Sequence, residues 1–319
     1  MKNLINLIYY IIFSKNIIVI RSPLQLINFY EFENIKKSLV NSKHPILFVF
    51  LNNHEFKQAI NTKNFLKFKR KIIFISSSQI KFLIFLKNIK RFIAGKYKIC
   101  ISGNMHNDTF QKSFLKNSER QFVLDDGGST LIIKKNSFRN YKDLKLFTIY
   151  KNNNLPKKYI IENNYDYLKK KIKKKGLKYN NDIHFVSSKI HSYLEGQSKI
   201  EYFNKIRKLK KLFPKKKIYY ISHRKENLKD LPKNLNLKII KLSVPLEVYY
   251  LKIKILPFLV ITNYSSAAFV LSKVLRSNLR IVNFSSDLKF LTNRKKELIS
   301  NFLIYKKIYK LFNIAQIRI

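Results

Sequence analysis

Residues 16–31 read NIIVIRSPLQLINFYE and contain one complete strand, turn and helix. Residues 16–20 form a short run that is apolar after Asn16 and rich in β-branched side chains, which predicts a buried strand. Ser22 is a suitable N-cap and Pro23 a suitable first-turn residue for a helix that continues through Glu31. Because a helix that begins at the carboxyl end of a strand presents free N–H groups and a positive dipole end, this turn is a natural place for a ligand.

The alternation of apolar strands and helical stretches continues along the chain. The further strands that we expect are at residues 45–51, 71–75, 96–101, 122–124, 183–188, 217–221, 237–240, 258–261 and, as the last one, 280–284. This alternation predicts an α/β fold with parallel, doubly wound sheets. Ligands of such sheets collect at the carboxyl ends of the strands, so polar residues at those ends are candidates for a site.

A polar, lysine-rich stretch at residues 151–182 separates two sets of strands. The chain has 319 residues, which is enough for two domains of ordinary size. We therefore expect one Rossmann-like domain at residues 1–155 and a second at residues 156–319. No repeat of fixed period relates the halves, which share only the α/β pattern.

Two adjacent carboxylates follow the expected strand at 122–124, where residues 122–130 read FVLDDGGST. The chain has 18 acidic residues against 65 basic ones, so the pairing of Asp125 with Asp126 is notable. In one interpretation the two acids only serve the turn that the following glycines make. In the other they carry chemistry, because neighbouring like charges raise one pKa and prepare a carboxyl group for proton transfer. These residues alone leave both interpretations open.

Three strands of the second half are followed by polar groups that suit a nucleotide. His223 and Arg224 can donate hydrogen bonds to a phosphate, and Ser265 and Ser266 add donors at the start of a helix. Glu247 can accept hydrogen bonds from ribose hydroxyl groups. Each group also has an ordinary role: a surface pair, a helix cap, and a complement to a helix dipole. The shared position at strand ends favours a nucleotide site over these separate roles.

The net charge of +47 and a pI near 10.2 allow three explanations. A basic surface can bind nucleic acid, or it can be attracted to an anionic membrane. It can also follow from a general bias toward Lys, Ile, Asn and Phe. We favour the bias, with membrane attraction as its consequence, because the charge is spread along the chain and no zinc-finger spacing or RNA-binding signature is present.

The apolar residues 4–13 are too few to cross a bilayer, which takes about 20 residues. No small-residue cleavage site follows them, so we expect a buried or membrane-surface segment, with a noncleaved anchor as the lesser alternative. Cys100 is the one cysteine, and its apolar neighbours indicate a buried thiol in a reducing compartment. The six histidines are scattered without metal-ligand spacing.

Four features in the same order resemble the bacterial lipooligosaccharide sialyltransferases of glycosyltransferase family 52 and the related capsule polysialyltransferases. They are the strand followed by SPLQL at residues 22–26, the acidic pair with Gly127, the motif at His223, and the pair Ser265–Ser266. The segment between Val244 and Ser266 also resembles the family's nucleotide-binding region. One departure is that the family's second motif is usually His-Pro, whereas His223 is followed here by arginine.

The resemblance implies a GT-B-type fold, with two Rossmann-like domains that face a cleft. It implies an enzyme that transfers sialic acid, with inversion, from CMP-sialic acid to a sugar hydroxyl group of a lipooligosaccharide or capsule glycan, without a metal or another cofactor. It implies Asp125 as the general base with Asp126 orienting it or the loop, although the sequence does not separate the two. It also implies His223, Ser265 and Ser266 at the CMP phosphate. The residues expected on the donor side are Ser22, Gly127, Arg224, Glu247, Ser265 and Ser266.

Two alternatives stay open. The departure at Arg224 keeps another nucleotide sugar possible as the donor of an enzyme with the same fold. A more remote alternative is a basic nucleic-acid-binding protein, for which the ordered acids and serines at strand ends are not needed. The expected partners are the nucleotide-sugar donor, a glycan or glycolipid acceptor, an anionic membrane surface and a second copy of the chain. We expect a cytoplasmic location on the inner face of the plasma membrane.

Overall fold

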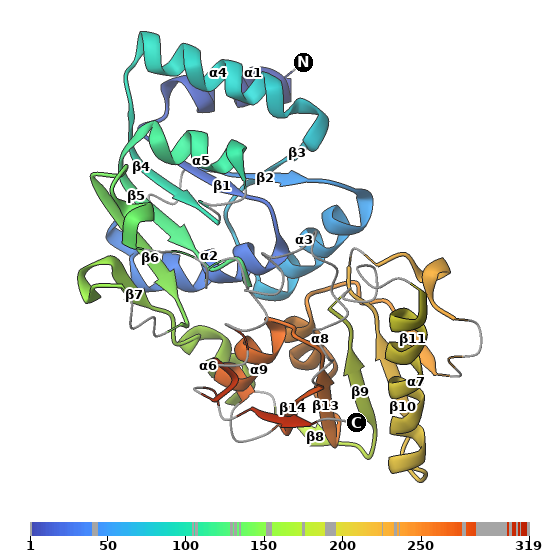
Figure 1. The fold of residues 1–319 in the computed structure, drawn as a ribbon. Helices are drawn as coiled ribbons and strands as arrows, with labels where there is room; N and C mark the ends of the chain where they lie inside the picture. Colours follow the sequence, from blue (N-terminus) through green and yellow to red (C-terminus); the bar gives the residue numbers. More distant parts are fainter. Residues whose placement is uncertain are drawn as a thin grey trace. The chain divides into compact units, whose positions relative to one another are not determined.

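Two parallel sheets organise the computed structural model, one in each of two units (Figure 1). The first unit comprises residues 1–167 and 243–245, and the second comprises residues 168–242 and 246–319. The residues that the structure describes are 2–39, 44–103, 105, 108–127, 130, 133, 135–150, 155–173, 176–188, 196–224, 226–232, 235, 237–275, 279–284, 305, 308–310, 312 and 314–317.

The first unit contains a seven-stranded sheet with the strand order β3-β2-β1-β4-β5-β6-β7. Its strands are β1 (Asn16–Ile20), β2 (Ile46–Phe50), β3 (Ile72–Ser76), β4 (Tyr97–Ser102), β5 (Ser118–Leu124), β6 (Asp143–Thr148) and β7 (Ile160–Glu162). Neighbouring strands pair in parallel throughout, as in Ile18 opposite Ile101 and Val19 opposite Leu47. The strand order reverses between β1 and β4, which in open α/β sheets is the point where ligands bind.

Helices cover both faces of this sheet. They are α1 (Lys2–Phe13), α2 (Pro23–Ile35), α3 (Asn53–Leu66), α4 (Ile80–Ile93) and α5 (Thr109–Lys116). Figure 1 shows α1, α4 and α5 on one face and α2 and α3 on the other. The core between them holds fully buried residues such as Phe29, Phe48 and Phe122, and Cys100 is buried there as expected.

In the first unit, strands β6 and β7 were not predicted, and β5 begins earlier than expected. Asp143 and Lys145 interrupt the apolar pattern of β6, whose burial comes from its place between β5 and β7 rather than from its composition. The first unit extends to Tyr167 because Tyr165 and Tyr167 are bound to α2. The Tyr165 hydroxyl donates to Asn28 Oδ1 at 2.5 Å, and the Tyr167 N–H donates to Glu31 Oε2 at 3.2 Å.

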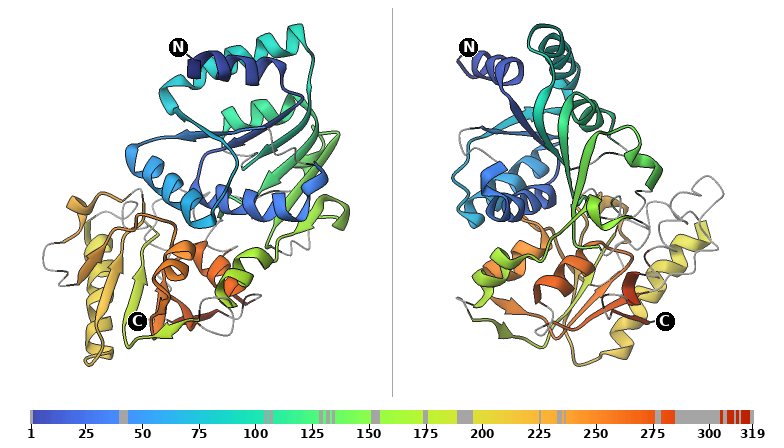
Figure 2. Two further views of the ribbon diagram at one scale, coloured as in Figure 1. Left: turned by 180° about the vertical axis from the view of Figure 1, so that it is seen from behind. Right: turned by 90° about the vertical axis from the view of Figure 1, so that its left-hand side faces the viewer.

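The second unit contains a six-stranded parallel sheet with the order β11-β10-β9-β13-β14-β15 (Figure 2). Its strands are β9 (Ile183–Val186), β10 (Ile218–Ile221), β11 (Lys238–Ile240), β13 (Leu259–Thr262), β14 (Ile281–Phe284) and β15 (Ala315–Ile317), with β8 (Lys178–Tyr179) and β12 (Ile255–Leu256) paired separately. Its helices are α6 (Asp166–Lys173, which begins in the first unit), α7 (Gly196–Leu212), α8 (Leu246–Ile253) and α9 (Ala267–Leu275).

The strand at residues 281–284 is not the last one, because β15 pairs with it in parallel. The sequence of β15 was missed because it is only three residues long and includes a glutamine. Short 3-10 helices lie at Lys37–Leu39, Ser77–Gln79, Lys135–Phe138, Lys157–Tyr159 and Leu228–Asp230. None of the helices in the described part of the chain has the length and apolar character that a membrane span requires.

Candidate active site

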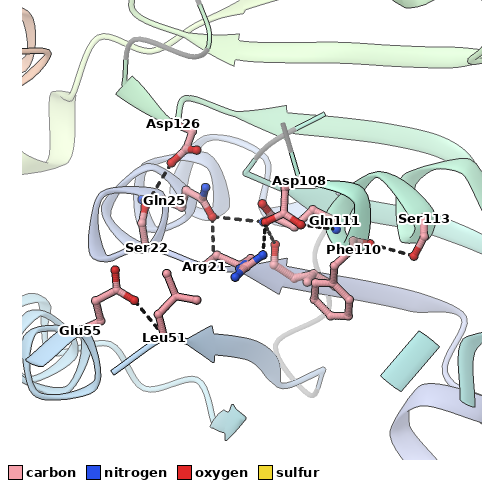
Figure 3. A network of polar contacts seen from close by, with 11 residues as sticks. Arg21, Ser22, Gln25, Leu51, Glu55, Asp108, Phe110, Gln111, Ser113 and Asp126 are labelled. Atoms are coloured by element: carbon pink, nitrogen blue, oxygen red, sulfur yellow. Dashed lines mark hydrogen bonds and ion pairs between the residues drawn. The ribbon is translucent and has the colours of Figure 1, made fainter. Parts of the chain in front are cut away.

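A network of polar side chains occupies the carboxyl ends of β1 and β4, at the point where the strand order of the first unit reverses (Figure 3). The Arg21 guanidinium donates to the Asp108 carboxylate at 2.5 Å, and the Arg21 backbone N–H donates to Gln25 Oε1 at 2.8 Å. Gln111 Nε2 donates to Gln25 Oε1 and to the carbonyl oxygen of Val19. The first turns of α2 and α5 are thereby fixed to the edge of the sheet.

Gly103 makes room for this network just after β4. A Cβ atom added at this position would lie 1.8 Å from Gln25 Cδ. Gln25 cannot withdraw freely, because its buried amide group is bonded to Arg21 and Gln111. Glycine at this position is therefore a condition for the close approach of α2 to the strand.

Ser22 connects the start of α2 to the acidic pair. Its side chain caps the helix by accepting a hydrogen bond from the Gln25 N–H at 3.1 Å, as the sequence predicts. The Ser22 hydroxyl donates to Asp126 Oδ1 at 3.4 Å. Asp126 is only partly buried, and its backbone N–H donates to Thr130 Oγ1 at 3.0 Å. Its carboxylate thus lies near the positive end of the α2 dipole, which stabilises negative charge.

Asp125 has a different environment from Asp126. It is 2% exposed, and its Oδ2 accepts a hydrogen bond from the Ile149 N–H at 2.7 Å, just after β6. Burial raises the pKa of this carboxyl group to about 7, against the lowering effect of hydrogen bonds from Thr148, Ile149 and Thr130. The charge of Asp126 raises the pKa further. The fold thus separates two acids that the sequence left equivalent.

The backbone of the acidic loop is held by α2 and by the end of the first unit. Asn28 Nδ2 donates to the carbonyl oxygen of Asp125 at 2.9 Å, and Asn28 Oδ1 accepts from Asn163 and Tyr165. Gly127 has a positive φ of 62°, a conformation that costs glycine little and other residues more. Gly127 therefore serves the turn after the two acids.

The raised pKa of Asp125 predicts a pH dependence of stability. A carboxyl group whose pKa is higher in the folded than in the unfolded state favours folding when it is protonated. Its contribution to the free energy of unfolding is complete below the pKa of the unfolded state and is lost as the pH rises through the pKa of the folded state. The free energy of unfolding should therefore fall between about pH 4 and pH 7 by an amount of order 1–4 kcal/mol from this group. In Asp125→Asn, which cannot ionise, urea unfolding across this range should show a smaller decrease. An unchanged pH profile in Asp125→Asn, with Asp166→Asn as the exposed control, would exclude this origin.

In the second unit, His223 and Arg224 follow β10 at the carboxyl edge of the sheet. The turn that carries them is fixed by the buried Glu226, whose carboxylate accepts from the His223 N–H at 2.8 Å and from the Tyr220 hydroxyl at 2.6 Å. The carbonyl oxygen of His223 accepts from the Glu226 N–H at 2.9 Å. Both His223 and Arg224 are half-buried, so part of each side chain reaches solvent.

Glu247 lies in the first turn of α8 and is 4% exposed. Burial raises the pKa of Glu247 to about 7, while the nearby charge of Arg224 lowers it. The structure therefore brings Arg224 and Glu247 within electrostatic range of each other. Because Glu247 lies in the first turn of α8, its carboxylate can also complement the helix dipole, which is the ordinary role that the sequence allowed.

Ser265 and Ser266 follow β13 and lie just before α9. Ser265 Oγ accepts a hydrogen bond from the Ala267 N–H at 3.3 Å, and Ser266 interacts with the Tyr305 hydroxyl. The preceding Asn263 is buried, donates to the carbonyl oxygen of Phe284 and accepts from Ser188. Because β10 and β13 both flank β9, the histidine turn and the serine pair share one sheet edge, with Ser187 and Ser188 between them.

The structure thus groups the predicted site residues by unit. Ser22, Asp125, Asp126 and Gly127 lie at the carboxyl edge of the first sheet, and the other five lie at the carboxyl edge of the second or at the helix that follows β11. Arg21 and Asp108 were not predicted as site residues, although Arg21 directly follows β1 and Asp108 caps α5. Within the described residues, no three His, Cys, Asp or Glu side chains gather closely enough to bind a metal ion.

Comparison with known proteins shows the fold. No protein-family model matches the chain, and no curated protein does. The chain is similar to a solved structure of a putative UDP-N-acetylglucosamine 2-epimerase from Listeria monocytogenes, with 11% identity, coverage of 94% of this chain and 88% of the other, and a TM-score of 0.55. An identity this low shows the fold alone. The fold is therefore α/β, with two Rossmann-like domains of the GT-B type, as predicted.

Two further solved structures cover the chain with TM-scores of 0.48. One is an α/β-galactoside α-2,3-sialyltransferase from the luminous marine bacterium Photobacterium phosphoreum, with 13% identity over 94% of this chain and 97% of the other. The other is a UDP-GlcNAc 2-epimerase from Neisseria meningitidis bound to UDP-GlcNAc, with 12% identity over 92% of this chain and 93% of the other. At these scores they decide nothing about the reaction, and the resemblance to family 52 stays a hypothesis based on the four motifs.

Proposed function

We propose that the chain is an inverting glycosyltransferase that moves sialic acid from CMP-sialic acid to a sugar hydroxyl group of a bacterial surface glycan of the lipooligosaccharide or capsule type. The observation that carries the proposal is the Asp126 carboxylate, which is partly exposed and lies at the N-terminus of α2, beside the point where the strand order reverses. A carboxylate at this edge is placed to meet a ligand.

The base in this reaction must take a proton from the acceptor hydroxyl as it attacks the anomeric carbon. The resemblance pointed to Asp125, but Asp125 is 2% exposed and is bonded to Ile149. Asp126 has the accessible carboxylate and a hydrogen bond from Ser22. We therefore assign the base to Asp126, and to Asp125 the role of positioning the loop between β5 and β6.

The leaving group in this reaction is CMP, whose phosphate gains negative charge in the transition state. His223, Arg224 and the serine pair lie on the sheet edge that suits a nucleotide in this fold. Hydrogen-bond donors fixed before the reaction stabilise such a charge without having to reorganise. Glu226 holds the histidine turn through two hydrogen bonds, which supplies this rigidity.

For the sugar donor, a second candidate besides CMP-sialic acid remains. Arg224 stands where the family usually has proline, and it lies in electrostatic range of Glu247. This pair can change the shape and charge of the site around the ribose, so another nucleotide sugar stays the second candidate. A nucleic-acid-binding role is the more remote alternative.

A donor panel tests the proposal. The purified chain is incubated with CMP-sialic acid, UDP-N-acetylglucosamine, UDP-galactose and GDP-mannose, and the released nucleotide is measured together with thermal protection by each free nucleotide. The proposal expects release and protection with CMP alone. Release of another nucleotide would identify the corresponding nucleotide sugar as the donor in place of CMP-sialic acid. Salt-dependent DNA binding, without protection by any nucleotide, would replace the enzyme proposal altogether.

A further inference from the structure

Helices α1 and α4 lie side by side on one face of the first sheet (Figures 1 and 2). They share a buried core in which Leu7 and Ile11 of α1 belong to the same cluster as Leu83 and Leu86 of α4. This packing leaves one side of each helix facing outward. The two outward sides form a surface that we call the α1–α4 face.

The exposed residues of the α1–α4 face are unusually apolar. On α1, Ile5, Tyr9 and Phe13 are spaced four residues apart, and their exposed fractions are 61%, 66% and 55%. On α4, Phe85 and Phe92 are seven residues apart, and Phe92 is 94% exposed. Single exposed apolar residues are ordinary, but aromatic side chains aligned on two adjacent helices indicate a surface that is covered by something else.

The charge of this face is entirely positive. Residues 1–30 and 71–107 contain no aspartate or glutamate. The exposed cations on the two helices and their flanks are Lys15, Lys81, Arg91, Lys96 and Lys98. Aromatic side chains that enter the acyl boundary, surrounded by lysines that reach anionic headgroups, are the features by which helices lie on a membrane.

A cavity of about 890 Å³ adjoins the same face at the amino ends of the strands. Tyr9 and Phe13 of α1 form part of its wall, and its charged lining residues are Lys15, Lys71, Lys98, Glu119 and Arg120. Arg120 also pairs with Asp143 at 3.1 Å, and the three lysines outnumber the single carboxylate in the cavity wall, so the opening carries a net positive charge that suits the phosphate of a lipid headgroup. Asp126 follows the carboxyl end of β5, so binding at the amino edge would not cover the candidate base.

We propose that the α1–α4 face is the surface through which the protein binds an anionic lipid bilayer, with the adjoining cavity accepting a phospholipid headgroup. A second copy of the chain fits this face less well, because two identical basic faces would repel each other. The inference does not depend on the identity of the sugar donor, and its test uses no nucleotide sugar.

Sedimentation with vesicles tests the inference. The full chain is mixed with vesicles of pure phosphatidylcholine, or of phosphatidylcholine and phosphatidylglycerol in roughly equal parts, at low and physiological salt. We expect binding to the anionic vesicles to be at least about 10-fold stronger. Phe85→Ser with Phe92→Ser should weaken this binding about 10-fold. The control Tyr179→Ser with Leu212→Ser removes two exposed apolar residues of the second unit and should change nothing.

Two double charge-reversal variants distinguish the effect of the α1–α4 face from the effect of the net charge of the chain. Lys81→Glu with Arg91→Glu should abolish most of the binding to anionic vesicles, whereas Lys211→Glu with Lys215→Glu changes the net charge equally and should not. Equal losses in both variants would overturn the assignment to this face, as would equal binding of wild-type protein to neutral vesicles. Loss of a homodimer in the phenylalanine variant, without vesicle binding by the wild type, would assign the face to a second copy. Circular dichroism confirms that each variant is folded.

Discussion

Asp126→Asn is expected to slow sugar transfer by about 10³-fold, because the acceptor hydroxyl then has no base to take its proton. Asparagine keeps the size of the side chain and can still accept the hydrogen bond from Ser22. The Michaelis constant for the donor should therefore change little while the turnover number falls. Steady-state kinetics of nucleotide release, measured with the acceptor present, provide both values.

Two controls separate this effect from a structural one. Asp166→Asn removes an exposed acid at the start of α6 and should leave turnover unchanged. Asp125→Asn should change the pH dependence of unfolding and should reduce turnover less than Asp126→Asn does. A larger loss of turnover in Asp125→Asn, with the fold intact, would return the role of base to Asp125.

His223→Ala is expected to reduce turnover by about 10²-fold, because one preorganised donor to the developing phosphate charge is lost. The histidine turn itself should persist, since the Glu226 carboxylate is bonded to the backbone N–H of residue 223 rather than to its ring. Turnover should fall more than nucleotide affinity does, because the charge on the phosphate grows in the transition state.

His223→Gln provides the matched control for the histidine. Glutamine keeps a side-chain N–H donor and should restore part of the lost turnover. Equal activity of the alanine variant and the wild type would remove His223 from the site. An alanine variant that loses nucleotide affinity and turnover by the same factor would assign His223 to ground-state binding instead.

The strand-helix alternation was enough to predict the fold class and the edges at which polar residues gather. It succeeded because strands at the centre of the two sheets, such as β1 and β13, are buried over most of their length and are therefore almost entirely apolar. It failed for β6 and β15, where lysine or glutamine residues interrupt short strands whose burial depends on their neighbours. Such strands are recognised only when the sheet is assembled.

The site was predictable as a set of residue types, but not as a set of roles. Asp125 and Asp126 are adjacent and chemically identical, and only the assembled fold distinguishes them: Asp125 is 2% exposed and accepts a hydrogen bond from the Ile149 N–H beyond β6, whereas Asp126 is partly exposed. The contact of Arg21 with Asp108 joins residues that are 87 positions apart. No local pattern predicts a pair at that separation, although each residue lies at the end or the cap of an expected element.

The central claim is that sialic acid is transferred to a sugar hydroxyl group. Mass spectrometry of a lipooligosaccharide-type acceptor, incubated with the wild-type chain and CMP-sialic acid, tests this claim most directly. We expect the acceptor to gain one sialic acid residue in step with CMP release, and Asp126→Asn to form the product about 10³-fold more slowly. An unmodified acceptor in the presence of bound or cleaved CMP-sialic acid, or conversion of UDP-N-acetylglucosamine to its 2-epimer by the same protein, would contradict this claim.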